Sequence, residues 1–86
     1  MAGMVVEYDT EVGAFYVRVT DEEIARTVEV SAFMNVDVDA DERVAGLELL
    51  CLPSAVTAEE RAVLEAQFPA AIGALAEVER LTPLSA

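Results

Sequence analysis

The sequence predicts an α+β fold, in which an antiparallel β-meander of four to five strands is followed by a C-terminal helical segment. Apolar and polar residues alternate with a period of two as far as residue 52, which is typical of half-buried strands. Pro53 ends this pattern, and after Thr57 the apolar residues recur at the i, i+3, i+4 spacing of a helix. We therefore expect a single domain over residues 1–86, with the sheet in residues 4–52 and the helical tail in residues 57–81.

The first two predicted strands form a hairpin. Residues 5–8 make a short strand, and residues 9–13 make a turn that ends on Gly13, a residue that tolerates a positive φ. Residues 14–19 are rich in aromatic and β-branched side chains, as strands are. The side chains of this second strand that we expect in the core are Phe15, Val17 and Val19.

Three further strands are predicted at residues 25–30, 35–39 and 44–50, and a turn at residues 40–43 joins the last two. In the last strand Val44 has the opposite parity to Leu47 and Leu49. A β-bulge at Ala45-Gly46 would bring all three to one face, because a bulge inserts one extra residue and a glycine within a strand often marks one.

The helical tail begins at a capping box. Thr57 is the expected N-cap and Glu60 occupies the third helical position. The first helix is predicted over residues 58–67, Pro69 breaks it or starts another helix at its first turn, and a second helical segment is predicted over residues 70–81. The apolar stripe along these helices consists of Leu64, Phe68, Ile72 and Leu75.

Composition excludes several function classes. The chain has no histidine or lysine among its five basic residues and carries a net charge of −12, so its surface repels nucleic acid and anionic lipid. The single cysteine, Cys51, lies within an apolar run and lacks a basic partner, which disfavours thiol catalysis. The sequence has no basic leader and no long apolar run, so we expect a cytoplasmic protein that is not an enzyme and uses no cofactor.

One arrangement imitates a calcium site. Asp37, Asp39, Asp41 and Glu48 have the spacing of positions 1, 3, 5 and 12 of a calcium loop. Glu42 replaces the glycine that such a loop needs at position 6, and the predicted elements around it are strands rather than helices. We therefore expect no metal site and a solvated acidic edge here, with a weak divalent-cation-binding module as an alternative.

Two apolar features suggest protein contacts. Phe33 and Met34 lie in a predicted connection, where they form an exposed contact patch or fold back onto the sheet edge. The stripe of the helical tail is interleaved with alanines that permit close helix approach. The expected interaction residues are therefore Phe33, Met34, Leu64, Phe68, Ile72 and Leu75, and a homodimer that uses the tail is the predicted assembly.

Three segments in order resemble a known family. They are YDTEVGAFYVRV at residues 8–19, RTVEV at residues 26–30 and NVDVDADERVAGLELL at residues 35–50. Together they resemble DUF2283, a small bacterial domain of unknown function, and the resemblance implies a compact antiparallel meander without assigned activity. The chain departs from the family at two turns, where Ala32-Phe33 replace a common Asp-Gly and Glu42 replaces a common Gly.

The function predicted from the sequence is that of a small non-enzymatic interaction domain that self-associates. The alternative is an acidic antitoxin-like or inhibitor protein that binds a basic partner, since the sheet half of the chain carries most of the negative charge.

Overall fold

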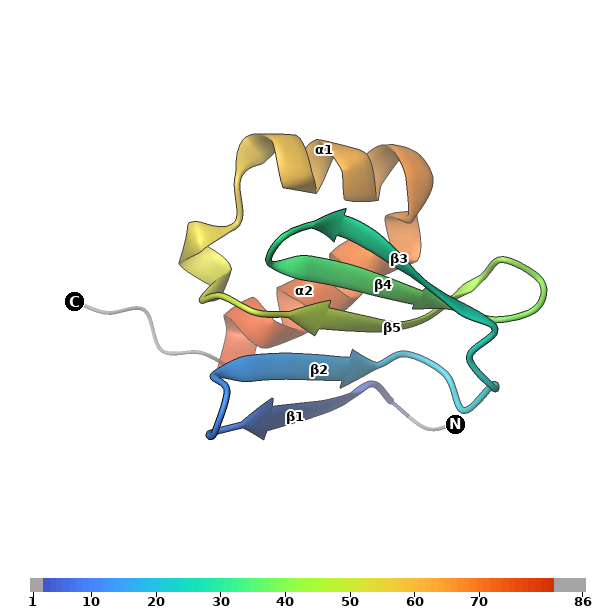
Figure 1. The fold of residues 1–86 in the computed structure, drawn as a ribbon, viewed down its shortest axis with the longest axis horizontal. Coiled ribbons are helices and arrows are strands. Elements are labelled where there is room, and N and C mark those ends of the chain that lie inside the picture. Colours follow the sequence, from blue (N-terminus) through green and yellow to red (C-terminus); the bar gives the residue numbers. More distant parts are fainter. Residues whose placement is uncertain (1–2, 82–86) are drawn as a thin grey trace.

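The computed structural model describes residues 3–81 and has the predicted α+β architecture. A five-stranded antiparallel sheet is followed by a 3₁₀ turn and two helices, and the helices pack on one face of the sheet (Figure 1). The elements are β1 (Val5–Asp9), β2 (Ala14–Arg18), β3 (Arg26–Ser31), β4 (Met34–Val38), β5 (Val44–Leu49), the 3₁₀ turn (Pro53–Ala55), α1 (Ala58–Gln67) and α2 (Pro69–Leu81).

The strand order differs from that of the predicted meander. The order is β1-β2-β5-β4-β3, so β5 lies between β2 and β4 and the chain passes from β2 to the far edge at β3. Turn patterns in a sequence predict the pairing of consecutive strands only. Such pairing is observed for β1 with β2, β3 with β4 and β4 with β5. The pairing of β2 with β5 has no local signal, and it gives the most buried strand the central position.

The predicted bulge in β5 is confirmed. Asp37 of β4 pairs with Gly46 and Val38 pairs with Val44, so Ala45 is the extra residue. Its carbonyl accepts hydrogen bonds from the backbone N–H groups of Val19 (2.8 Å) and Thr20 (3.3 Å). The bulge turns Val44 to the same face as Leu47, and both residues lie in the core.

Both departures from the family pattern are accommodated without glycine. Ala32 and Phe33 turn between β3 and β4 with no positive φ, and the register slips by one residue at Val30 instead. Glu42 adopts φ 64°, a left-handed conformation that a side chain rarely takes. Its carboxylate forms an ion pair with Arg26 of β3, so the same residue that bears the strain also ties the turn to the sheet.

The helices close the core in cis. Thr57 and Glu60 form the predicted capping box, and Pro69 is the first residue of α2, where its lack of an N–H costs nothing. Figure 1 shows α2 crossing behind the sheet, and its contacts are with β2 and β5, while α1 contacts β3. The fully buried side chains that the helices contribute are Leu64, Ala71, Ala74, Leu75 and Val78.

We expect Glu42→Gly to be more stable than Glu42→Ala by about 1 kcal/mol in urea unfolding. Both variants lose the exposed ion pair to Arg26, but only glycine removes a left-handed strain of ~1–2 kcal/mol, part of which its larger unfolded-state entropy offsets. At Asp41, in the same turn without a positive φ, alanine should be at least as stable as glycine. The same order at both positions would contradict a strained Glu42.

Candidate functional site

The face of the sheet that turns away from the helices carries polar side chains in register across all five strands. One row runs Glu7, Tyr16, Glu48, Asn35 and Glu29, from β1 through β2, β5 and β4 to β3. The amide of Asn35 donates to the carboxylate of Glu48 at 2.8 Å. We call this surface the open face, since both helices make their sheet contacts on the other side (Figure 1).

A partly buried polar contact crosses the middle of the open face. The hydroxyl of Tyr16 donates to Asp37 Oδ2 at 2.8 Å, and Thr27 Oγ1 donates to Asp37 Oδ1 at 2.5 Å. The tyrosine reaches Asp37 by lying directly over Gly46, where a Cβ would stand 2.0 Å from the hydroxyl oxygen. Gly46 therefore provides the space that lets β2, β4 and β3 share one hydrogen-bonded cluster.

Burial of Tyr16 and its hydrogen bond to Asp37 raise the pKa of the tyrosine to about 12. The neutral hydroxyl is the donor that Asp37 requires, so ionisation of Tyr16 would break the cluster. Tyr16 and Asp37 do not act as an acid–base pair, because the tyrosine stays protonated throughout the physiological range. The cluster thus shapes the surface rather than transferring protons.

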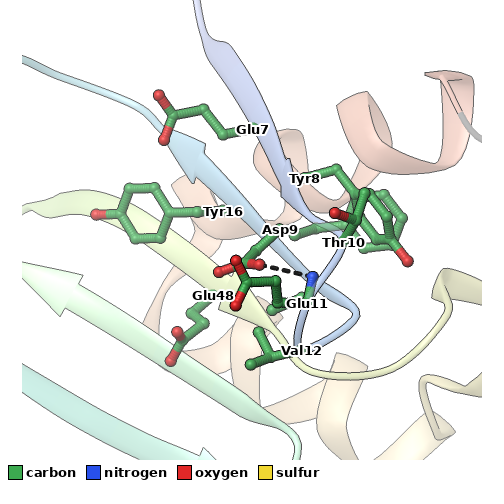
Figure 2. A pocket seen from close by; sticks show the side chains of 10 residues that line it. Glu7, Tyr8, Asp9, Thr10, Glu11, Val12, Tyr16 and Glu48 are labelled. Atoms are coloured by element: carbon green, nitrogen blue, oxygen red, sulfur yellow. Dashed lines mark hydrogen bonds between the residues drawn. The ribbon is translucent and has the colours of Figure 1, made fainter.

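Negative charge dominates the open face. The acidic residues that its strands place there are Glu7, Asp9, Glu29, Asp37 and Glu48. Arg18 is the basic residue that the described strands place among them. At the β1 end, Glu7, Asp9, Glu11 and Glu48 line a shallow hollow of about 600 Å³ beside Tyr16 (Figure 2).

The residues of the calcium-like spacing do not converge. Asp37 and Asp39 are 9% and 4% exposed, so the expected solvated acidic edge is wrong for both. Asp39 follows the last residue of β4 instead of lying within the strand, and its Oδ1 accepts from the backbone N–H groups of Asp41 (2.8 Å) and Arg43 (2.9 Å). The bond from Arg43 is the main reason that the pKa of Asp39 is lowered. Glu48 lies on the open face, paired with Asn35.

Within residues 3–81, no three histidine, cysteine or carboxylate side chains come close enough together to hold a metal ion. The acids of the turn instead fix its conformation, as Asp and Asn commonly do by accepting from the backbone two residues on. The four acids of the calcium-like spacing are therefore distributed over strand β4, the turn that follows it and the bulged strand β5.

The predicted interaction residues divide between core and surface. Met34, Leu64 and Leu75 have no exposed surface, so they stabilise the core of one chain and form no contact patch. Phe68 and Ile72 are half-buried against that core. Phe33 is 55% exposed, and its carbonyl accepts from the N–H of Leu50 at 2.8 Å.

Sequence reasoning missed the cluster around Asp37. No local pattern links Tyr16 or Thr27 to Asp37, because the three residues lie on the separate strands β2, β3 and β4. The available signal was Gly46, since a glycine within a strand also marks the close approach of another group. Cys51 is half-buried, and burial raises the pKa of its thiol.

The high pKa of Tyr16 gives a pH prediction. In a Tyr8→Phe protein, the near-ultraviolet absorbance of tyrosinate should rise with a midpoint of about 12. The folded-state pKa lies above the unfolded value of 10.0. The contribution of Tyr16 to the free energy of unfolding is therefore complete below pH 10 and is lost as the pH rises toward 12. Adding Asp37→Asn should lower the midpoint, and adding Asp41→Asn should not. A midpoint insensitive to Asp37→Asn would contradict the contact.

Within residues 3–81, neither helix combines the length and the apolar character needed to span a membrane. Comparison with curated proteins found no match, and comparison with solved structures found none. A family model described as "Protein of unknown function (DUF2283)" matches residues 5–51, the segment that holds all five strands. The matched segment is more than half of the chain, and the chain therefore belongs to the DUF2283 family.

Proposed function

We propose that this domain is a non-enzymatic interaction module whose open face binds a basic surface of another protein. The observation that carries the proposal is the surplus of carboxylates on a sheet face that the chain's own helices leave uncovered. A face of one charge sign favours encounter with the opposite sign and rejects like-charged partners. An acidic antitoxin-like or inhibitor protein, which covers a basic partner, fits this description.

The chemistry of the open face supports binding over catalysis. Its most buried polar groups, Tyr16 and Asp37, hold each other and leave no buried side-chain polar atom unpaired within residues 3–81. A general acid or base needs a pKa near the working pH, and the pKa of Tyr16 is moved further from it. The remaining carboxylates are available to pair with basic side chains.

A titration with oligoarginine tests this function. The variant Glu7→Gln/Glu29→Gln/Glu48→Gln should bind about tenfold more weakly, because it loses charge on the open face while keeping its shape. The matched control, Glu22→Gln/Glu23→Gln/Glu65→Gln, removes equal charge from exposed positions elsewhere and should bind nearly as the parent does. Calorimetry at physiological salt measures both, and equal losses would mean that net charge alone attracts the peptide.

Self-association is a second candidate, supported by a different surface. Phe33, Leu50 and Leu52 are exposed side chains of two loops at one end of the sheet, and the backbones of Phe33 and Leu50 are hydrogen-bonded. Burial of such a patch gains about 25 cal/mol per Å², which salt does not screen. The stripe of the helical tail is occupied in cis, so this end patch is where a homodimer would form.

Sedimentation equilibrium at tens of micromolar tests the dimer. The parent chain should sediment as a dimer and Phe33→Glu as a monomer, because a charge would be buried without a partner. Ile24→Glu, at an exposed apolar position in the connection at the opposite end of the sheet, should leave the dimer intact. A monomeric parent would remove the second candidate.

A further inference from the structure

Strand β1 is an edge strand that the rest of the chain leaves unpaired on one side. It pairs with β2 alone among the described elements, and four of its residues are exposed. The main helix contacts of the sheet are with β2, β5 and β3, and none of comparable extent involves β1. An edge of this kind presents a row of backbone N–H and C=O groups to which another strand can be added.

The side chains of β1 specify what such a strand would carry. Glu7 and Asp9 lie on the open face beside the acidic hollow, where Figure 2 shows them with Glu11 and Glu48. Val6 and Tyr8 lie on the opposite face, and the half-exposed ring of Tyr8 packs against Phe15 at a centroid distance of 4.7 Å. An added strand would therefore face carboxylates with one set of alternate side chains and apolar groups with the other.

We propose that β1 accepts an extended segment of a partner protein as a sixth strand, in which basic side chains alternate with apolar ones. The proposal rests on the proposed function, since it assigns the partner class and the binding mode for the same acidic face. Basic side chains of the segment would reach the hollow lined by Glu7, Asp9 and Glu48. Apolar side chains would lie against Val6 and Tyr8.

Charge selects such a segment over a second copy of this chain. Antiparallel pairing of two β1 strands about Glu7 would place Glu7 opposite Glu7 and Asp9 opposite Val5, and like charges directly opposite each other are destabilising. Repulsion between the acids of β1 thus disfavours pairing of two β1 strands, whereas a strand of opposite charge can still pair with this edge.

The other edge is less suitable. At β3, Arg26 adds a positive charge at one end and is held by Glu42. At the other end Ser31 donates to the carboxylate of Glu60, which joins the strand to α1. The two edges therefore differ in charge and in access, although Glu7 of β1 and Glu29 of β3 end the same cross-strand row of the open face.

The experiment uses the full chain, isotope-labelled, and a peptide in which arginine alternates with valine. In nuclear magnetic resonance titrations, the amides of β1 should shift and gain protection from hydrogen exchange, while those of β3 should not. A second peptide, in which prolines replace the valines, keeps the charge but loses half of the backbone donors and cannot pair along a strand. We expect it to bind at least about tenfold more weakly, because two or more backbone hydrogen bonds are lost.

A matched pair of variants separates this inference from the proposed function. Glu7→Lys should weaken binding of the arginine–valine peptide about tenfold, and Glu29→Lys, at the other end of the same row, by less than about threefold. Equal weakening by both variants, or equal binding of the proline peptide, would overturn strand addition at β1 and leave the open face as the binding surface. Binding that neither variant weakens would overturn both.

Discussion

Burial of β5 on both faces is the constraint around which this domain is arranged. On the helix side, Leu47 and Leu49 have no exposed surface and pack in the core with α1 and α2. On the open side, Gly46 lies beneath Tyr16, whose hydroxyl crosses it to reach Asp37. A central strand must satisfy both neighbours, and the bulge at Ala45 lets β5 place Val44 in the core without moving Gly46 from the tyrosine.

The two faces of the sheet consequently have separate roles. The apolar face packs against the stripe of the helical tail, so the chain closes its core in cis, while large apolar side chains such as Phe33, Leu50 and Leu52 remain exposed. The other face is polar, and cross-strand hydrogen bonds join Asn35 to Glu48 and Thr27 to Asp37 on it. Histidine is absent, Tyr16 stays protonated at neutral pH and Cys51 is half-buried, and these observations support the proposal that recognition uses charge and the open edge.

The turns show how side chains replace glycine in this member of the family. Asp39 accepts from two backbone N–H groups of the β4–β5 turn, and these bonds hold Glu42 in its left-handed conformation. Arg26 pairs with the carboxylate of Glu42. At the β3–β4 turn, Ser31 accepts from the N–H of Phe33 and donates to Glu60, so one hydroxyl joins the turn to the helix cap. Acids that resemble metal ligands in the sequence are thus parts of a turn.

The sequence by itself determined the features that depend on near neighbours: the alternation that defines the strands, the stop at Pro53, the capping box of Thr57 and Glu60, and the bulge at Ala45-Gly46. These follow from periodicity and local backbone chemistry. Only the tertiary structure decided that β5 pairs with β2, that Met34 is core, and that Asp37 is covered by Tyr16 and Thr27. Such outcomes depend on which distant segments meet, and a two-residue period cannot distinguish a solvated acid from one that a neighbouring strand covers.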